Sequence, residues 1–401
     1  FHKIVLGMIS VSEAKRLMMA AVPDPVVIDL PIAKASDHFA GSDIRAPFDH
    51  PLFNCSAVDG YAFHFEDVHG PMQVCDEVQA GGTLDNAVGP AQCVRIFTGA
   101  EVPEGADTVV MQEYCTRDGD MITVDDARLV RGGNIRKQGQ QIKAEGTVVV
   151  KGTVLNASAI GLLACVGVVT VPVGRVPEVS IIRTGGEFTE PGATPAPGKI
   201  FSSNDLMLSV ALKEVLSCAG NEVFTARDSM DELRWSFERA LEVSEVVICT
   251  GGVSVGDHDL VLPVLQQMGA ELIFHCVAQK PGKPMLFARI NGKFVFGLPG
   301  NPRAVMVLFW EYVVLFLQAM QGAADPGLKS NVLKLRDPLV VKGDRAEFRA
   351  AIVRDGHVEL LRDEGSHMLH SLVHADVLAY VPENRRSYLK DDPIEVHWLP
   401  K

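Results

Sequence analysis

Charged residues and paired glycines follow four apolar segments in the third quarter of the chain. Thr184 and Glu187 flank a Gly-Gly pair, and Asp228 follows the next segment. The third loop, at 250–259, reads Thr-Gly-Gly-Val-Ser-Val-Gly-Asp-His-Asp. The fourth segment precedes Lys-Pro-Gly-Lys-Pro at 280–284, and Gly-Leu-Pro-Gly-Asn-Pro comes later. Loops of this composition predict a site that handles an anion and a metal ion.

Each residue type has a defined role in such chemistry. Gly251 and Gly252 let backbone N–H groups close on an anion, and a helix N-terminus adds positive potential. Ser254 can donate a hydroxyl hydrogen bond, and Lys280 and Lys283 supply point charges. The predicted metal ligands are hard carboxylate oxygens, which Mg²⁺ accepts together with phosphate and water: Glu187, Asp228, Asp257 and Asp259. This set of side chains suits a phosphoanhydride bound with its metal.

Each of these features also has a purely structural interpretation. A Gly-Gly pair after a strand is usually a turn, and Asp257 could cap a helix. Pro299 could shape a turn and Pro302 the start of a helix. The functional interpretation is favoured because all of these residues are predicted at one rim. The chain has no Walker loop and no Rossmann fingerprint, which disfavours a P-loop phosphotransferase and a nicotinamide enzyme.

The rim is expected to belong to a domain at 177–326, in which strands alternate with helices. The expected strands are 179–183, 222–225, 246–250, 271–275, 285–288 and 294–297. The alternation predicts a doubly wound α/β domain with a parallel sheet covered on both faces. Ligands bind outside the carboxyl ends of the strands in such sheets, where the four loops would meet. Asn301 is expected to cap the helix that begins at Pro302.

The rest of the chain predicts β-rich units around this central domain, so the fold class is multidomain α/β plus β. Residues 1–44 and 143–176 are expected to form a discontinuous first domain, interrupted by an inserted β-rich domain at 45–142. Residues 327–401 alternate like short antiparallel strands and predict a small C-terminal β-barrel. Two motifs of the inserted domain contain Asp59 and Thr98. Taken alone, each motif would be interpreted as a structural turn.

Composition limits the possible partners and the compartment. The 401 residues carry a formal net charge of −13, which argues against broad nucleic-acid binding. Eight scattered cysteines without a C-x-x-C pair indicate thiols in a reducing compartment. The most membrane-like stretch, 304–320, is short and carries Glu311 and Gln318, so a buried core helix is expected instead. These features predict a cytoplasmic protein without a membrane segment.

Five strings together resemble the MoeA family, the molybdopterin molybdenumtransferases, over nearly the whole chain. They are Ser56-Ala-Val-Asp-Gly-Tyr61, the string at 97–105, the loop at 250–259, Lys280-Pro-Gly-Lys-Pro284 and Gly297 to Pro302. The resemblance implies an elongated homodimer of four domains, with a MogA-like third domain and a first domain that links and dimerises. It implies that Mg²⁺ and molybdate convert adenylylated molybdopterin into molybdenum cofactor with release of AMP. A MogA-like adenylyltransferase would be the partner enzyme.

The resemblance also assigns roles to individual residues. Asp59 and Thr98 would reach across the dimer to the site of the other subunit. Glu187, Asp228 and Asp259 match the acidic positions of the family, and Lys280 and Lys283 match its basic pair. Arg349 and Ser366 match positions associated with the oxyanion pocket. The substrate-binding set is completed by residues of the glycine and proline loops: Thr184, Gly251, Gly252, Ser254, Pro299 and Pro302.

Two alternatives to this function remain open. Gln141, Gly186 and His275 stand where the family usually has charged residues. They motivate a non-catalytic or altered-specificity paralogue that binds molybdopterin, or one that inserts tungstate. A nucleotide-cleaving or adenylylating relative could share only the third domain, but the strings of the inserted domain and the β-rich tail count against it.

Overall fold

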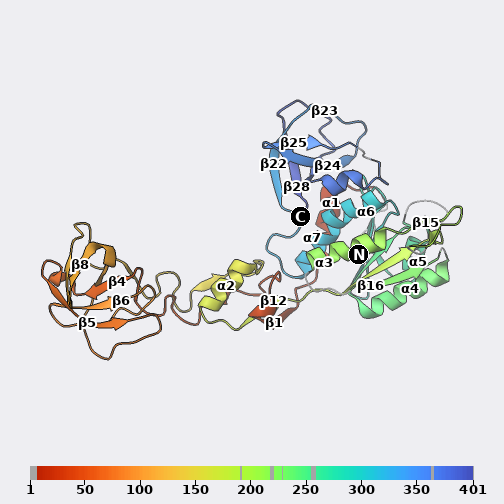
Figure 1. Cartoon of the computed structure of the whole chain (residues 1–401). Coiled ribbons are helices and arrows are strands. Elements are labelled where there is room, and N and C mark those ends of the chain that lie inside the picture. The colour runs from red at the N-terminus through yellow and green to blue at the C-terminus, as the bar shows by residue number, and fades with distance from the viewer. Residues whose placement is uncertain are drawn as a thin grey trace.

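The computed structural model describes residues 7–189, 192–216, 221–227, 229–253, 259–362 and 365–400. Figure 1 shows an elongated molecule with a β-rich module at one end and an α/β unit at the other. A short middle segment joins the two, and a β-barrel lies against the α/β unit. The predicted fold class, multidomain α/β plus β, is confirmed by this arrangement.

The α/β unit is built on a six-stranded sheet with the order β16-β13-β17-β21-β20-β18. The strands are β13 (Val179–Thr184), β16 (Asn221–Ala226), β17 (Val246–Thr250), β18 (Glu271–His275), β20 (Leu286–Ile290) and β21 (Lys293–Leu298). β17 is buried along its whole length, as expected for a strand covered on both faces. β16, β13, β17 and β21 run parallel, so their carboxyl ends share one edge. A short parallel pair, β14 (Phe188–Thr189) with β15 (Ile200–Phe201), follows β13.

The prediction of an all-parallel sheet is wrong at β20, which pairs antiparallel with β21 and with β18. The cause is a two-residue hairpin turn at Asn291-Gly292, where both residues have positive φ, 50° and 77°. Such a turn matches the twist of its flanking strands and returns the chain beside itself. The Asn-Gly pair is a sequence signal for this hairpin, and it explains why no helix separates the two strands.

Helices cover both faces of the sheet, as predicted. α4 (Met230–Val243) and α5 (Val261–Gln267) pack in one core cluster, and α3 (Asn204–Val215) packs in the other. The cluster that contains α3 also contains α1 (Val11–Met19) and a continuous helical segment that begins at Pro302. That segment consists of α6 (Pro302–Leu308), the π-helical turn η4 (Phe309–Val313) and α7 (Val314–Met320). It is long and apolar enough to cross a membrane, but it is 83% buried in this fold, which confirms the predicted core helix.

The C-terminal unit is the predicted small barrel. Five strands close on themselves in the order β24-β25-β22-β28-β26, because β26 pairs with β24. The strands are β22 (Ser330–Leu335), β24 (Ala346–Arg354), β25 (His357–Leu360), β26 (Val377–Val381) and β28 (Pro393–Trp398). β23 (Leu339–Val340) pairs with β27 (Ser387–Tyr388), and α8 (His370–His374) packs near β24. A sixth strand, β19 (Gln279–Lys280), comes from the α/β unit and pairs parallel with β24.

The module at the far end is a six-stranded sheet with the order β7-β4-β6-β5-β9-β8. Its strands are β4 (Gly60–Phe63), β5 (Met72–Val78), β6 (Gln92–Ile96), β7 (Thr108–Met111), β8 (Cys115–Asp118) and β9 (Met121–Val124), with short helices η2 (Phe65–Asp67) and η3 (Gln112–Tyr114). β3 (Cys55–Ser56) pairs antiparallel with β10 (Ile135–Arg136). Two small core clusters fill the module.

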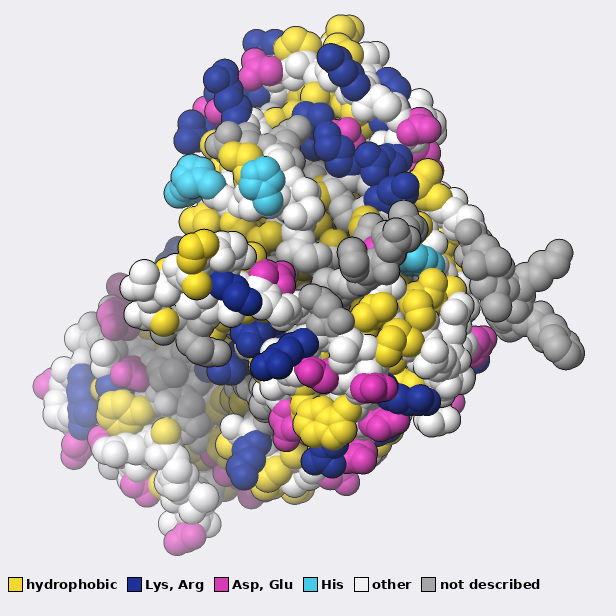
Figure 2. Space-filling view, turned by 90° about the vertical axis from the view of Figure 1, so that its right-hand side faces the viewer, with side chains coloured by type: hydrophobic (Ala, Val, Ile, Leu, Met, Phe, Trp, Pro, Cys, Tyr) yellow, Lys and Arg dark blue, Asp and Glu magenta, His cyan; other side chains and the backbone are white. Residues whose placement is uncertain are grey.

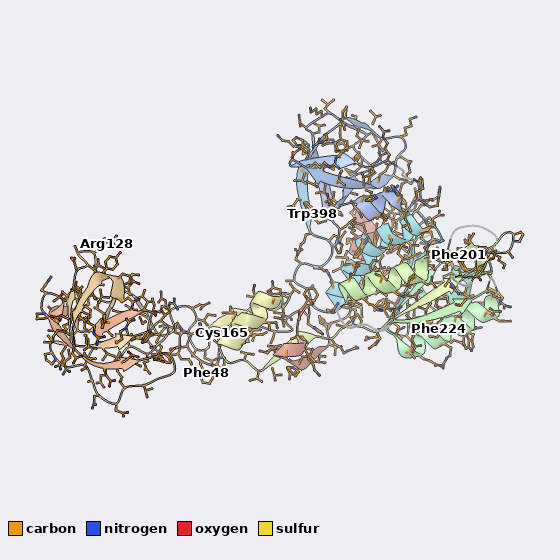
Figure 3. All side chains as sticks on the ribbon, viewed as in Figure 1. Phe48, Arg128, Cys165, Phe201, Phe224 and Trp398 are labelled. Carbon is orange, nitrogen blue, oxygen red and sulfur yellow. The ribbon has the colours of Figure 1, made fainter. Side chains whose placement is uncertain are left out.

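The middle segment is narrow. It contains the two-stranded ribbon β1 (Val27–Pro31) with β12 (Thr170–Gly174), the pair β2 (Ile44–Arg45) with β11 (Thr147–Val149), η1 (Ile32–Lys34) and α2 (Ala157–Cys165). One small core cluster contains side chains that precede the inserted module in the sequence together with side chains that follow it. In Figure 3, Phe48 and Cys165 mark this segment, Arg128 marks the module and Phe224 marks the α/β unit.

Candidate functional site

The loop with both lysines lines a cavity of about 500 Å³ between the α/β unit and the barrel. Four residues predicted from the sequence line it: Lys280, Lys283, Pro299 and Ser366. Figure 2 shows Lys and Arg side chains gathered on the face where the barrel meets the α/β unit. The cavity is therefore walled by both units and has concentrated positive charge, as an anion site requires.

Lys280 is placed by strand pairing. β19 adds to the barrel sheet, so that Gln279 lies opposite Ala346 and Lys280 opposite Glu347. The Lys280 side chain is half exposed, and its Nζ lies 3.9 Å from Glu347 Oε1. Glu347 is buried, and its other oxygen accepts a hydrogen bond from Arg349 and is ion-paired with the same guanidinium. The predicted oxyanion residue Arg349 thus lies behind Lys280, with one carboxylate between the two cations.

Ser366 is tied to the start of α6. Its hydroxyl accepts a hydrogen bond from Asn301 Nδ2 at 2.9 Å, and its carbonyl accepts from the backbone N–H of Arg303 at 3.1 Å. Pro302 is the first residue of α6, as predicted. Asn301 precedes it in the N-cap position but makes no side-chain cap hydrogen bond, and its amide nitrogen donates to Ser366 instead. This contact brings a residue of the barrel unit to the edge of the α/β sheet.

A second group of predicted residues lies at the carboxyl ends of β13 and β17. The Thr184 hydroxyl donates to the Thr250 carbonyl at 3.0 Å, and Gly251 follows directly. A Cβ atom on Gly251 would lie 2.5 Å from Thr184 Oγ1, and Gly251 has a φ of +88°, so only glycine fits. Gly252 also has a positive φ, and the exposed Glu187 carboxylate lies against Gly185.

The two groups are neighbours through the end of β21. The Gly251 N–H donates to the Leu298 carbonyl at 2.9 Å, and the next residue, Pro299, lines the cavity. Asp259 is half-buried two residues before α5 begins. Asp228, Ser254 and Asp257, which were also predicted for the site, lie outside the described residues.

The described carboxylates fit a magnesium ion held by few protein ligands. Within the described ranges, no three His, Cys, Asp or Glu side chains gather as a preformed metal cage. Mg²⁺ does not require such a cage, because it commonly takes one or two carboxylates and completes its shell with phosphate oxygens and water. The exposed Glu187 and the half-buried Asp259, at the edge that carries the glycine turn, have the right donor chemistry for this mode.

Asp59 and Thr98 lie together, but in the inserted module at the other end of the chain (Figure 1). The Thr98 N–H and its hydroxyl both donate to Asp59 Oδ1 at 2.8 Å. These hydrogen bonds lower the pKa of Asp59 below its ordinary value, and the one from the Thr98 backbone has the larger effect. The pair is exposed and keeps a negative charge, and within one chain it is separate from the lysine cavity.

The three departures from the family motifs, His275, Gln141 and Gly186, all lie among described residues. His275 Nε2 lies 2.9 Å from the Val253 carbonyl oxygen, so its ring bonds the backbone of the glycine-rich loop. Gln141 is exposed, and its backbone N–H donates to the carbonyl of His50. Gly186 is exposed, with its carbonyl accepting from Lys199 Nζ.

Two polar residues of the lysine cavity were not predicted from the sequence. Arg345 was not predicted at all, and Asn301 was predicted only as a helix cap and not as part of the cavity wall. Arg345 Nη1 donates to the Gln279 carbonyl at 3.3 Å, just before Lys280. No spacing in the chain links a barrel residue to this loop. Only the pairing of β19 with β24 brings them together, so tertiary structure was needed to find Arg345.

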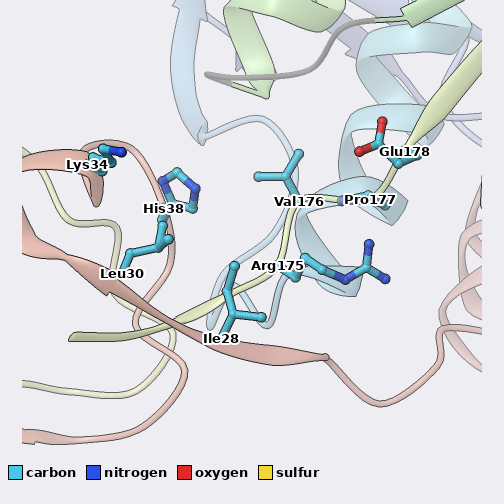
Figure 4. A pocket seen from close by; sticks show the side chains of 8 residues that line it. All are labelled: Ile28, Leu30, Lys34, His38, Arg175, Val176, Pro177 and Glu178. Carbon is cyan, nitrogen blue, oxygen red and sulfur yellow. The ribbon is translucent and has the colours of Figure 1, made fainter. Parts of the chain in front are cut away.

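A different cavity, of about 340 Å³, lies where the middle segment meets the α/β unit (Figure 4). Its walls include the apolar Ile28, Leu30 and Val176, and its rim carries Arg175. Arg175 is paired with Glu245 at 2.5 Å, an acid that also accepts from the Glu178 N–H. None of the predicted site residues lines this cavity, so the lysine cavity is the candidate site.

Comparison with known proteins identifies the family of the chain. Three family models match consecutive parts of the chain: the MoeA N-terminal region (domain I and II) at 9–167, a probable molybdopterin binding domain at 180–319 and the MoeA C-terminal region (domain IV) at 332–399. A molybdopterin molybdenumtransferase of Staphylococcus epidermidis is 35% identical over 325 residues, which is 79% of this chain and 76% of that protein. One from Staphylococcus aureus strain COL is 35% identical over 324 residues, covering 79% and 77%.

Solved structures show the same architecture over the whole chain. A crystal structure of the molybdopterin biosynthesis MoeA protein from Pyrococcus horikoshii OT3 superposes with a TM-score of 0.84 at 27% identity, covering 98% of this chain and 100% of that one. Another from Pyrococcus horikoshii gives 0.81 at 29% identity, covering 98% and 99%. With the lysine cavity, the glycine turn and the barrel in the same chain as these matches, the chain belongs to the MoeA family, the molybdopterin molybdenumtransferases.

Proposed function

We propose that the protein inserts molybdate into adenylylated molybdopterin with the help of Mg²⁺ and releases AMP, which completes molybdenum cofactor. The observation that carries this proposal is the cavity of about 500 Å³ lined by Lys280 and Lys283 beside the glycine turn. A cavity of this size suits a small polyanion, and its lysines lie next to the sheet edge where an α/β fold binds nucleotides.

The proposed roles follow from charge. Addition of a solvent water molecule across the phosphoanhydride would give AMP and the pterin phosphate with release of a proton. This leaves an additional negative charge, which Lys280 and Lys283 would neutralise from the cavity wall. Gly251 and Gly252 would present backbone N–H groups to the phosphates, with Ser254 donating a hydroxyl hydrogen bond. A bound Mg²⁺, held by carboxylates from the set Glu187, Asp228, Asp257 and Asp259, would withdraw charge from the bridging oxygens. No covalent enzyme nucleophile is proposed.

Molybdate is proposed to bind on the barrel side of the same cavity. Ser366 lines that side and Arg349 lies behind it, and Arg345 adds a third cation to the wall. Thr184, Pro299 and Pro302 would shape the pterin side. From there the oxyanion would be delivered to the dithiolene sulfurs of the pterin.

The assembly is proposed to be a cytoplasmic homodimer, in which Asp59 and Thr98 of one subunit complete the site of the other. The support is their position at the far end of an elongated chain, where they are available to a second copy. A MogA-like adenylyltransferase would supply the substrate, since the anhydride must be made before it is cut.

The test is AMP release from adenylylated molybdopterin in the presence of Mg²⁺ and molybdate. Lys280→Ala and Asp228→Ala are expected to lower the rate by about 100-fold or more, as loss of electrostatic stabilisation does. Lys151→Ala, an exposed lysine of the middle segment, is the matched control. Unchanged rates in both site variants would contradict these roles. Binding of molybdopterin without turnover by the unmodified protein would support the non-catalytic alternative, and a higher rate with tungstate would reassign the oxyanion.

A further inference from the structure

A buried glutamine precedes the lysine loop and uses both ends of its side-chain amide. Gln279 is fully buried. Its Nε2 donates to the carbonyl of Pro281 at 2.8 Å, and its Oε1 accepts a hydrogen bond from the hydroxyl of Tyr312. Pro281 stands between Lys280 and Lys283 in the chain. The amide therefore fixes a backbone carbonyl in the middle of the segment that carries both cations.

Tyr312 is itself fixed in the core of the α/β unit. It is fully buried in the π-helical turn η4, and π-turns inside helices frequently occur at functional sites. Burial raises the pKa of Tyr312 well above its ordinary value, so the hydroxyl remains a hydrogen-bond donor. Lys15 Nζ lies 5.6 Å from the centre of its ring.

The barrel side of the loop is held by a separate contact. Arg345 Nη1 donates to the backbone carbonyl of Gln279 at 3.3 Å, and Gln279 pairs with Ala346 in the β19–β24 register. Gln279 thus receives one contact from the core helix and two from the barrel. Leaving a buried amide without one of its hydrogen-bond partners costs free energy. Displacement of the loop would break these contacts, so the arrangement resists it.

We infer that Tyr312 and Gln279 are positioning residues, which hold the 280–283 loop so that Lys280 and Lys283 face the anion together. The identity of the anion in this inference rests on the proposed function. The binding test does not, because it measures anion affinity without turnover. A hydrogen bond that served only the core would affect stability and leave anion affinity unchanged. A bond that positions the lysines must affect anion affinity through them.

The sharpest variant is Tyr312→Phe, which removes one hydroxyl. Its matched control is Tyr388→Phe, in which the altered side chain is buried in the barrel core. Binding of molybdate and of inorganic pyrophosphate is measured by titration calorimetry on the full chain. Tyr312→Phe is expected to weaken binding of at least one anion about three- to tenfold, the effect of one lost hydrogen bond. Tyr388→Phe is expected to bind as the unmodified protein does.

A double-mutant cycle then tests the route of the effect. If Tyr312 acts through the loop, Tyr312→Phe should add no further loss in a Lys283→Ala background, whereas independent effects would multiply. Gln279→Met, which removes both side-chain hydrogen bonds at similar volume, should weaken binding at least as much as Tyr312→Phe. It serves as the second variant if Tyr312→Phe does not fold.

Three outcomes overturn the inference: unchanged anion binding in folded Tyr312→Phe and Gln279→Met, multiplied effects in the cycle, or no binding of either anion by the unmodified protein. Failure of the proposed function is distinguishable, because it would give anion binding that depends on Tyr312 without AMP release. In the turnover assay the same variants should raise KM for molybdate or lower kcat, while their melting temperatures need not follow the same order.

Discussion

One carboxylate oxygen of Glu347 accepts a hydrogen bond from Arg349 Nε at 2.8 Å and forms an ion pair with Arg349 Nη2 at 2.7 Å. The carboxylate is buried, and its other oxygen faces Lys280 at 3.9 Å. One negative charge therefore offsets two cations at the candidate site. This relationship makes Glu347 a determinant of both stability and the field in the cavity.

Replacing Glu347 with glutamine should separate these two effects. The free energy of unfolding is expected to fall by about 1–3 kcal/mol, because the largely buried Arg349 loses its charged partner. Molybdate binding is expected to tighten about two- to fivefold at low salt, because Lys280 is no longer partly neutralised. Urea unfolding and calorimetry measure the two quantities. Glu359→Gln, whose contacts with Arg336 and Arg354 are 3.9 and 3.8 Å, should change stability by less than about 0.5 kcal/mol. Weaker molybdate binding in Glu347→Gln would contradict the expected sign.

Mixed dimers test whether the module of one subunit serves the cavity of the other. Asp59→Ala and Lys280→Ala homodimers should both release AMP at a small fraction of the normal rate. Co-expression with two affinity tags gives heterodimers in which one site has lost both residues and the other has lost neither. These heterodimers should recover about half of the normal activity per dimer, since one shared site is intact. Activity no higher than in the two parent variants would show that each subunit uses its own Asp59.

The contact between the barrel and the core helix should depend on pH. Burial alone would raise the pKa of Glu311, but the hydrogen bond from His397 and the charge of Lys15 outweigh it, so the pKa lies below 4.5. Burial alone would lower the pKa of His397, but its hydrogen bond with Glu311 and the Glu311 charge raise it above 6.5. Among the described residues, the pair also has these titratable neighbours: Lys15, Glu395, Tyr312 and Tyr380.

The sign follows from these two directions. The His397 contribution is complete below pH 6.5 and is lost as the pH rises through the raised value, and the Glu311 contribution is complete above pH 4.5. The difference in unfolding free energy between the unmodified protein and His397→Gln should therefore be largest between pH 5 and 6 and shrink towards pH 9. Denaturant titrations across this range measure it, with the exposed His370→Gln as control. A difference that grows with rising pH would be the wrong sign.

Gly251 should tolerate no side chain. Gly251→Ala is expected to lower the free energy of unfolding by about 1–3 kcal/mol, because of its positive φ and the close Thr184 hydroxyl. The displaced turn should also weaken pyrophosphate binding. Gly300→Ala is the local control, because a Cβ there meets no atom within 4 Å. Equal stability of the two variants in thermal unfolding would contradict the need for glycine at the turn.

Much of the α/β unit could be predicted because its signals are local. The apolar run of β17 and the alternation of strands and helices gave its position and its two covered faces. The alternation does not predict the direction of β20, because that direction depends on the tight turn at Asn291-Gly292. The barrel could be predicted from short alternating strands, but β19 could not. Two residues carry no periodicity, and their pairing with β24 exists only in the folded chain.

The candidate site was predictable only in part, for the same reason. Glycines, lysines and prolines of recognisable spacing marked the loops, and Lys280, Lys283, Pro299 and Ser366 do line one cavity. Arg345 and Tyr312 stayed invisible because their partner Gln279 is distant in the chain and lacks a motif. Asn301 occupies the predicted N-cap position, but its side chain donates to Ser366 and makes no cap hydrogen bond, a contact that sequence alone does not reveal.

The ribbon of β1 and β12 has a mechanical consequence. Antiparallel pairing from Val27 with Gly174 to Pro31 with Thr170 makes a slender stalk between the two ends of the molecule. A rotation about that stalk displaces each atom in proportion to its distance from the pivot. The β-rich module at the far end would sweep through a wider arc than the parts of the chain that lie next to the ribbon. If two subunits share a site as proposed, small torsions of the stalk would change the distance between the two parts of that site.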